Sequence, residues 1–511
     1  MQLTLPQTEP AAVGSAVVLG VDALPITIEA IMHGDGRGVQ VLGSVDRVVR
    51  ESIHRVLNGF RTAGLPPPRG VPIVNFAPAD LPKTGTSFDL PLALALAAAN
   101  GQASRAGLAD VTAVGEVTLE GRVLPARGIV PIALAARDSG RPIVLAAAAS
   151  ATQAAEIEGV LAYPIERLVD AIAFTHLAER PEPTPRSPAL PEPDTSDLDL
   201  ADLHGLESAK RALCAAAVGG HNVLLVGPPG SGKSALARRL AGLLPTLEAT
   251  ERLEILRVRS TIDTETSLQA VRRPFRAPHH SSSPASLLGG GSVPRPGEVT
   301  LAHHGVLFLD ELPEFRREAL EGLRQPLEER HITIGRAART TTMPADFTLV
   351  AAMNPCPCGF AGDAAHACRC SAGQRAAYRA RVSGPLLDRF DLIVSVPPLA
   401  PHEYRAAPDP TWSTSALRRR VESARAAATA RALGPSDRLK GAGLRDAVGL
   451  DAAAESTLQR VLRLHRMSGR GRTRVLRLAR TLADLGGARR VGAEHIAEAA
   501  RFRCGLGLFG T

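Results

Sequence analysis

The sequence predicts a multidomain α/β protein with three folded parts, and three observations support this prediction. The chain has 511 residues, which corresponds to about three domains of ordinary size. A proline-rich stretch near residues 179–199 contains little that a folded core could bury. Strand-like and helical segments alternate up to about residue 400, whereas the later segments have helical periodicity only.

These signals divide the chain into four regions. Residues 1–178 contain strand-like segments such as VPIVNFAP and helical ones such as SVDRVVRESIHRVLNGF, which indicates an α+β domain. Residues 179–199 form an extended linker. Residues 200–400 contain buried strands such as HNVLLV and GVLFLD and are expected to form an α/β domain. Residues 401–511 are expected to form a helical domain.

The composition excludes several classes of protein. Apolar residues make up 45% and charged residues 22%, which is too apolar for a disordered chain. No apolar run approaches the ~18 residues that a membrane span requires. The N-terminal residues lack the basic region of a signal peptide, and the six cysteines do not resemble a disulfide framework. We therefore expect a cytoplasmic protein. Its net charge of +8 is compatible with a polyanionic partner.

A complete phosphate-binding motif follows the strand-like segment HNVLLV. Eight consecutive residues match G-x-x-x-x-G-K-[ST]: Gly227, Pro228, Pro229, Gly230, Ser231, Gly232, Lys233 and Ser234. In such loops backbone N–H groups and the start of the next helix bind phosphates. Lys233 is expected to contact the β- and γ-phosphates of ATP, and Ser234 to bind Mg²⁺.

Polar residues that follow later strands complete the predicted site. Asp310 ends the strand VLFL and is expected to bind Mg²⁺, while Glu311 polarises the attacking water. Asn354 ends the next strand, where its amide can position the same water. Arg389 precedes the strand LIVSVP, and an arginine presented there can reach the phosphate of a neighbouring subunit.

The order and spacing of these residues resemble the AAA+ ATPases. The segments RPFRAPHHSSSPASLLGGG, PGEVTLAHHGVLFLDELPEF and SGPLLDRFDL further resemble the magnesium-chelatase-like branch, and in particular its ComM/YifB family. This resemblance implies a homo-hexameric ring with ATP bound between subunits, Arg389 as the finger in trans and Asn354 as the sensor. It also implies that residues 401–511 form a lid whose second sensor is Arg477, with Arg474 as the alternative.

Two clusters suggest metal ligands. Cys356, Cys358, Cys368 and Cys370 form two C-x-C pairs, and four thiolates at short range suit tetrahedral Zn²⁺. Reduced thiols in a surface loop are the alternative, and His366 is an alternative ligand. The pairs His279–His280 and His303–His304 are not expected to chelate, because adjacent strand residues point to opposite faces. A pore-lining insertion that contacts nucleic acid is the preferred interpretation of residues 272–304.

The N-terminal domain resembles the Lon-type proteases without their general base. In LPKTGTSFDLPL, Ser87 falls on the position of the nucleophile, but the Lon lysine falls near Val130. A serine without a base is a poor nucleophile. We therefore expect a Lon-like domain that serves assembly or DNA contact rather than proteolysis.

Three functions remain under comparison. The first is an ATP-dependent DNA motor, which the resemblance extends to a branch-migration helicase for homologous integration during natural transformation. Its expected partners are single-stranded and branched DNA and recombination proteins. The second is a magnesium-chelatase-type motor that remodels, or inserts metal into, a partner protein. The third is a non-enzymatic or proteolytic Lon relative.

Overall fold

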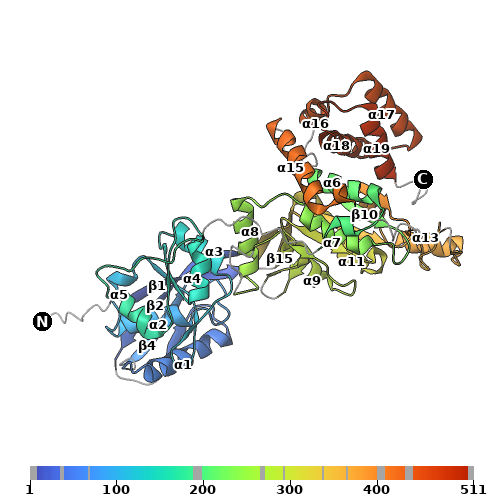
Figure 1. Ribbon diagram of the computed structural model, residues 1–511. Coiled ribbons are helices and arrows are strands. Elements are labelled where there is room, and N and C mark those ends of the chain that lie inside the picture. The colour runs from blue at the N-terminus through green and yellow to red at the C-terminus, as the bar shows by residue number, and fades with distance from the viewer. Residues whose placement is uncertain are drawn as a thin grey trace. The chain divides into compact units, whose positions relative to one another are not determined.

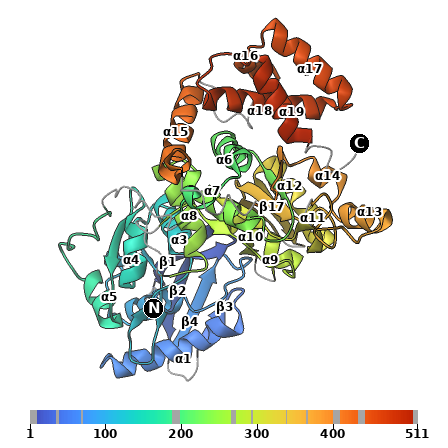
Figure 2. The same ribbon diagram turned by 45° about the vertical axis from the view of Figure 1, so that its right-hand side comes forward.

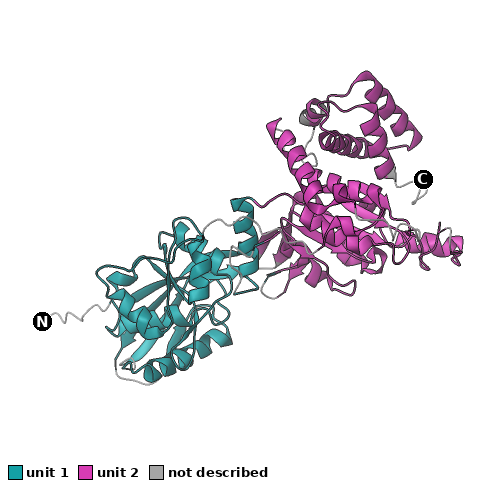
Figure 3. Cartoon of the chain, in the orientation of Figure 1, with its two compact units in different colours: residues 1–191, 248–271, 292–295 teal, residues 192–247, 272–291, 296–511 magenta. Residues whose placement is uncertain are grey.

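The structure is a computed structural model, and it describes most of the chain. The described residues are 9–34, 39–66, 70–187, 198–264, 271–291, 294–336, 339–363, 366–399, 409–431 and 441–504. They form two compact units (Figure 3). Unit 1 comprises residues 1–191, 248–271 and 292–295, and unit 2 comprises residues 192–247, 272–291 and 296–511. Both units contain sheets and helices, which confirms the predicted α/β class.

Unit 1 is built on a seven-stranded mixed sheet with the order β3-β4-β2-β1-β5-β8-β9 (Figure 1). The strands are β1 (Ala11–Leu19), β2 (Asp22–His33), β3 (Gln40–Leu42), β4 (Val71–Ala77), β5 (Val111–Ala113), β8 (Ile143–Ala146) and β9 (Leu161–Pro164). A short hairpin joins β6 (Glu116–Val117) to β7 (Val123–Leu124). Buried residues alternate with half-buried ones along β4, so one face of this strand is more fully covered than the other.

Helices cover the central strands of this sheet. They are α1 (Arg47–Thr62), α2 (Asp89–Ala99), α3 (Ile129–Asp138), α4 (Ala148–Ala155), α5 (Leu168–Thr175) and α8 (Ala249–Ser260). Helix α2 contains mainly Leu and Ala, which favour helix, and it packs on β1 and β2 and against α1. Helix α3 packs on the same two strands and also contacts α4 and α8.

Helix α8 belongs to unit 1 although its sequence follows the phosphate loop. The backbone N–H of Gly128 donates to Ser260 O at 2.6 Å, and Arg257 Nε donates to Val21 O at 2.9 Å. The sequence-based division placed these residues in the region 200–400. No local pattern marks the exchange, because it depends on contacts between residues more than 120 positions apart.

The first part of the proline-rich stretch packs on unit 1. Arg180 forms two hydrogen bonds of 2.9 Å with Asp110, and the Thr184 N–H donates to Ala162 O at 2.8 Å. Residues 188–197 of the expected linker lie outside the described residues. The ordered chain thus continues beyond residue 178 as part of this unit.

Unit 2 contains a five-stranded parallel sheet with the order β11-β14-β17-β10-β18. The strands are β10 (Val223–Val226), β11 (Phe275–Arg276), β14 (Val306–Leu309), β17 (Thr348–Met353) and β18 (Leu392–Ser395). Strands β10, β14 and β17 are buried at every residue, which is why each reads as an uninterrupted apolar run. The carboxyl ends of parallel strands share one edge, and that edge carries the predicted site.

Helices surround this sheet, and a helical lid follows it. The helices are α6 (Glu207–Gly219), α7 (Lys233–Leu243), α9 (Pro284–Leu288), α10 (Glu298–Leu301), α11 (Arg317–Gly322), α12 (Arg324–Glu329), α13 (Ala372–Ala380) and α14 (Gly384–Leu387), and a hairpin joins β15 (His331–Arg336) to β16 (Arg339–Pro344). We call the last five helices the lid: α15 (Thr414–Ala430), α16 (Gly441–Val448), α17 (Ala452–Leu464), α18 (Gly469–Leu485) and α19 (Ala493–Cys504).

The lid shares a hydrophobic core with the sheet of unit 2. Figure 2 shows α16 to α19 grouped together in red at the top of the view, with α15 leading to them. Helices α15 and α18 pack against α6, and their apolar residues join the cluster that covers β10 and β18. Over the described parts of the chain, no helix has both the length and the apolar character that crossing a membrane requires.

Candidate active site

The phosphate loop connects β10 to α7, and its glycines are required for two different reasons. A Cβ on Gly227 would overlap the carbonyl oxygen of Val396, so a larger residue does not fit there. Gly230 and Gly232 have φ of +76° and +89°, a region that glycine adopts without strain. The loop leads directly into the first turn of α7, whose N–H groups lack intrahelical acceptors and suit an anion.

Lys233 lies inside the loop that it is expected to serve. Its Nζ donates to the carbonyl oxygens of Gly227 at 2.8 Å and Pro228 at 2.7 Å, and it lies 3.3 Å from Asn354 Oδ1. Burial lowers the pKa of the Lys233 ammonium, and the Asp310 carboxylate opposes that shift. Within the described part of the chain, the buried Oγ of Ser231 has no hydrogen-bond partner. A buried polar atom of this kind fits a ligand oxygen.

The two predicted Mg²⁺ ligands contact each other at the carboxyl edge of the sheet. Ser234 Oγ donates to Asp310 Oδ2 at 2.7 Å, although the residues are 76 positions apart. Hydroxyl and carboxylate oxygens are ligands that Mg²⁺ prefers. Together with the phosphate loop, they fit a magnesium–nucleotide complex.

Glu311 follows Asp310 in a left-handed conformation with φ of +53°. Its side chain is 58% exposed, and its Oε2 lies 3.2 Å from Nδ1 of His280. The site therefore contains a side chain from the β11–α9 segment that contacts the predicted catalytic carboxylate.

Arg389 has a different environment. Its guanidinium forms an ion pair with Glu328 of α12, its Nη1 donates to Pro385 O at 2.9 Å, and its side chain is only 7% exposed. Among the described residues, its Nε has no acceptor. In the isolated chain Glu328 thus holds the predicted finger.

Two arginines of the lid, Arg474 and Arg477, lie near Asp391, which precedes β18. Arg474 Nε lies 3.8 Å from Asp391 Oδ1, and the Asn222 N–H donates to its Oδ2 at 3.1 Å. Burial by itself would raise the pKa of Asp391, but His221 and Arg474 hold it below its ordinary value. Burial lowers the pKa of the Arg477 guanidinium, and Asp391 partly offsets that shift.

Arg389 and the lid arginines therefore lie at the opposite edge from the phosphate loop of the same chain. Asn222 immediately precedes β10 and binds both Asp391 and the carbonyl of Arg389, whereas Gly227 immediately follows β10. Five residue steps along this extended strand separate Asn222 from Gly227 by about 16 Å. The structure brings together the loop, Asp310, Glu311 and Asn354, but it does not bring Arg389 or Arg477 to them.

The four cysteines converge. The Sγ atom of Cys356 lies 3.4 Å from that of Cys358 and 3.7 Å from that of Cys368, and all four Sγ atoms lie within 4.8 Å of one another. The pKa of the Cys358 thiol is lowered to about 6, because the backbone N–H groups of Phe360 and Arg369 donate to its sulfur.

His366 lies beside this cluster without joining it. Its Nδ1 is 3.1 Å from Asp363 Oδ2, and its ring packs on Phe360.

The expected geometry of the histidine pairs is wrong. The ring centroids of His279 and His280 are 4.1 Å apart, and those of His303 and His304 are 3.8 Å apart, so each pair lies side by side. Both pairs lie in turns rather than in strands, and His304 has φ of +58°. The alternation of strand side chains therefore does not apply to them.

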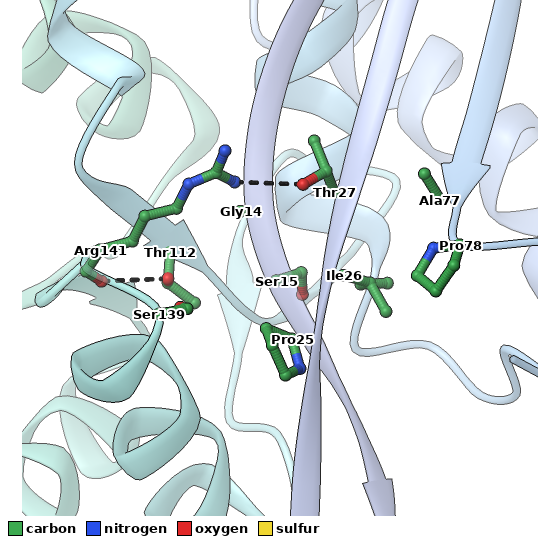
Figure 4. A pocket seen from close by; sticks show the side chains of 10 residues that line it. All are labelled: Gly14, Ser15, Pro25, Ile26, Thr27, Ala77, Pro78, Thr112, Ser139 and Arg141. Atoms are coloured by element: carbon green, nitrogen blue, oxygen red, sulfur yellow. Dashed lines mark hydrogen bonds between the residues drawn. The ribbon is translucent and has the colours of Figure 1, made fainter.

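The Lon-like features of unit 1 do not form a catalytic pair. Ser87 lies in the turn before α2, and Val130 is completely buried in α3. A pocket of about 360 Å³ opens elsewhere in this unit (Figure 4). There Arg141 Nη1 donates to Thr27 Oγ1 at 3.4 Å, and Ser87 is not among the lining residues.

Sequence reasoning missed the residues that contact the predicted catalytic groups. His280 was considered only as a metal ligand or pore residue, and Glu328 and Asp391 were not considered. No spacing rule connects His280 with a residue 31 positions later, so only the fold reveals the contact. For Asp391, its place directly before a buried strand was the available signal.

Together, the parallel sheet, phosphate loop, acidic pair and helical lid define a P-loop ATPase of the AAA+ type. The family described as "Magnesium chelatase, subunit ChlI" matches residues 199–404, "Subunit ChlI of Mg-chelatase" matches 28–149, and "Magnesium chelatase, subunit ChlI C-terminal" matches 411–503. The chain belongs to the ComM/YifB family of magnesium-chelatase-like AAA+ ATPases, which confirms the resemblance seen in its motifs. This family implies ATP and Mg²⁺ as cofactors.

Relatives support this assignment along the whole chain. Competence protein ComM of Haemophilus influenzae is 38% identical, over 96% of this chain and 97% of the relative. Protein YifB of Escherichia coli is 39% identical, over 96% of both. A magnesium-chelatase 67 kDa subunit of Chlorobaculum parvum is 29% identical over 217 residues, which cover 40% of this chain and 28% of the relative.

Proposed function

We propose that this protein is an ATP-dependent DNA motor that works as a homo-hexameric ring, with helicase or branch-migration activity. One observation carries the proposal. The phosphate loop and acidic pair lie at one edge of the sheet, whereas Arg389 lies at the other edge. An ATPase site with a finger is therefore complete only when a second subunit supplies that arginine.

Each residue of the site has a definite part in hydrolysis. The phosphate loop and Lys233 hold the phosphates, and Ser234 and Asp310 hold Mg²⁺. An Mg²⁺ ion held by these two residues would supply positive charge to offset that of the phosphates. Glu311 accepts a proton from the attacking water, and Asn354 orients that water beside Lys233.

Arg389 and Arg477 act on the nucleotide of the neighbouring subunit. Arginine fingers are worth ~10³–10⁵ in rate where they have been measured. Arg389 forms an ion pair with Glu328 in the isolated chain. This ion pair must break before Arg389 can reach the neighbouring nucleotide. Arg477 is kept as the proposed second sensor, and Arg474, whose Nε lies 3.8 Å from Asp391 Oδ1, is the alternative.

DNA is the proposed substrate because exposed positive charge occurs on the lid of a chain whose net charge is +8. The segment 461–480 holds seven arginines and no acid. Of these, Arg463, Arg466 and Arg470 are exposed, whereas Arg480 is completely buried. The three exposed arginines are available to contact phosphates of single-stranded or branched DNA.

The biological setting follows from the relatives. A full-length relative is a competence protein, which favours a role in homologous integration of incoming DNA during natural transformation. Recombination proteins in the cytoplasm are the proposed partners.

A forked or branched DNA incubated with protein and ATP tests the motor. We expect strand separation or branch movement that requires ATP and is lost in Arg389→Ala. A wild-type protein that hydrolyses ATP, yet neither binds DNA at low salt nor moves its branches, contradicts the proposal. It would support the second function, a chelatase-type motor acting on a partner protein, which the similarity to a magnesium-chelatase subunit favours.

We also propose that the cysteine cluster binds one Zn²⁺. With Zn–S bonds of about 2.3 Å, the sulfurs of a tetrahedral site are about 3.8 Å apart. The Sγ separations of 3.4, 3.6 and 3.7 Å are close to that value. Elemental analysis of protein purified without added metal tests this: about one zinc per chain is expected, and a folded zinc-free protein contradicts it.

A further inference from the structure

The cysteine loop packs directly against the phosphate loop. Gly359, which lies between Cys358 and Cys368, has φ of +86° and sits against the ring of Pro229. A Cβ at position 359 would lie 2.5 Å from Cδ and 2.9 Å from Cγ of that ring, and 3.9 Å from Cγ of Asn354. Only glycine allows the two loops to approach this closely.

The thiols fix the turn that carries Gly359. Cys356 is completely buried two residues after Asn354, its carbonyl accepts from the Gly359 N–H at 3.0 Å, and its Sγ accepts from the Ala361 N–H at 3.3 Å. Cys356 thus holds the turn through both its carbonyl and its sulfur, and it lies two residues after the sensor Asn354.

The far end of the cysteine loop also returns to the nucleotide site. Ser371 follows Cys370 and caps α13 by accepting from the Gln374 N–H at 3.1 Å. From this helix the buried phenol oxygen of Tyr378 accepts from the backbone N–H of Asn354, and burial raises the pKa of Tyr378 to about 12. Both ends of the loop therefore contact the strand end that carries the sensor.

We propose that the four-cysteine loop is a positioning element for nucleotide binding, and that zinc occupancy and ATP affinity are coupled through the contact between Gly359 and Pro229. Zinc fixes the turn, the turn supports Pro229 and Asn354, and the phosphate loop is held in the conformation that binds phosphates. The inference rests on the proposed zinc and ATP sites. Coupling between two sites is reciprocal, so ATP must tighten zinc by the factor by which zinc tightens ATP.

The first experiment measures this coupling in the full chain. Zinc is removed with a chelator and restored, and Mg²⁺–ATP affinity is measured by calorimetry at each stage, with circular dichroism to confirm folding. We expect the dissociation constant for ATP to rise on the order of tenfold without zinc and to recover on its return. We also expect ATP to lower the amount of zinc that a competing chelating dye binds at equilibrium. An equal affinity with and without zinc overturns the proposal.

Two glycines provide a matched pair of variants. Gly362 has φ of +84° in the same loop, but no atom lies within 4 Å of the position its Cβ would occupy. Gly359→Ala and Gly362→Ala therefore introduce the same backbone strain, and only the first disturbs Pro229. We expect both variants to retain about one zinc, and only Gly359→Ala to bind ATP more weakly.

The outcomes separate this inference from the proposals beneath it. If the two alanine variants bind ATP equally well, the contact with Pro229 does not couple the sites, although zinc and ATP binding both stand. If the purified protein contains no zinc, both the metal proposal and the coupling fail. If Lys233→Ala binds ATP as well as wild type, the nucleotide site itself is wrongly assigned.

Discussion

Nδ1 of His280 lies 3.2 Å from a carboxylate oxygen of Glu311, the residue proposed to activate water. Glu311 sits in a left-handed backbone conformation and its side chain is more than half exposed, so few other contacts restrain it. His280 is held in turn by its neighbours, because its ring lies beside that of His279 and 6.5 Å from that of Phe315. The imidazole therefore orients the carboxylate.

Replacing His280 with Ala should lower kcat for ATP hydrolysis by about tenfold and leave KM for ATP nearly unchanged. A hydrogen bond to a charged group is worth ~1.5–3 kcal/mol. Losing this bond should misorient Glu311 and slow the chemical step, and it should leave nucleotide binding unaffected. Steady-state kinetics measures both constants. His331→Ala is the control, because that imidazole contacts Glu329 rather than Glu311. A raised KM with unchanged kcat would assign His280 to binding.

A variant of the phosphate loop should impair ATP binding, whereas a variant of the acidic pair should impair ATP hydrolysis. Lys233→Ala should lose most nucleotide affinity, because its ammonium contacts the phosphates. Glu311→Gln should bind ATP normally but hydrolyse it ~10²–10⁴ times more slowly, because the amide cannot accept the proton of water. Equilibrium binding and single-turnover hydrolysis measure the two steps. Near-normal turnover in Glu311→Gln would remove this residue from the mechanism.

Arg389 should work between subunits. Arg389→Ala should reduce turnover by ~10³–10⁵ while ATP still binds. Mixing this variant with Lys233→Ala should restore part of the activity, because a ring then pairs an intact phosphate loop with an intact arginine. Mixed rings are verified by differential tags. If verified mixed rings are as inactive as the separate variants, the arginine does not act in trans.

The buried lid arginine should be structural, unlike its neighbour one turn earlier. Arg480 is 1% exposed, and donates to Asp484 at 2.8 Å and to Ala488 O at 2.6 Å. Arg480→Ala leaves the Asp484 carboxylate with less compensation and should cost about 3–5 kcal/mol of unfolding free energy. Arg477→Ala should change this free energy little while lowering turnover. Denaturant unfolding and ATPase assays distinguish them, and equal destabilisation by both would contradict the assignment.

Salt dependence should reveal the DNA-binding surface. Each phosphate contact contributes ~0.7–0.9 to the slope of log affinity against log salt. Replacing Arg463, Arg466 and Arg470 together with Ala should therefore reduce the slope for single-stranded DNA by up to about two. Fluorescence anisotropy over a salt series measures it. Arg50→Ala, an exposed arginine of α1, serves as the charge control. An unchanged slope in the triple variant would place DNA elsewhere.

Local sequence predicted the features whose physics is local. The run Val306–Leu309 predicts a buried strand, because parallel strands bury both faces. Residues 227–234 predict a phosphate loop, because the whole motif lies within eight consecutive residues. Asp310 and Asn354 each follow a strand-like run, and their place in the motif series predicts that they lie with that loop. The proximity of the four cysteines followed from their spacing in the same way.

The sequence by itself determined the family, the α/β class and the residues at the carboxyl edge of the ATPase sheet, because each depends on short-range pattern. Only the tertiary structure decided that α8 packs in unit 1, that His280 contacts Glu311, that Glu328 holds Arg389 and that Gly359 supports Pro229. These contacts join residues that are 31 or more positions apart in the chain. Their formation depends on how whole elements pack, and that packing leaves no periodicity or spacing in the sequence.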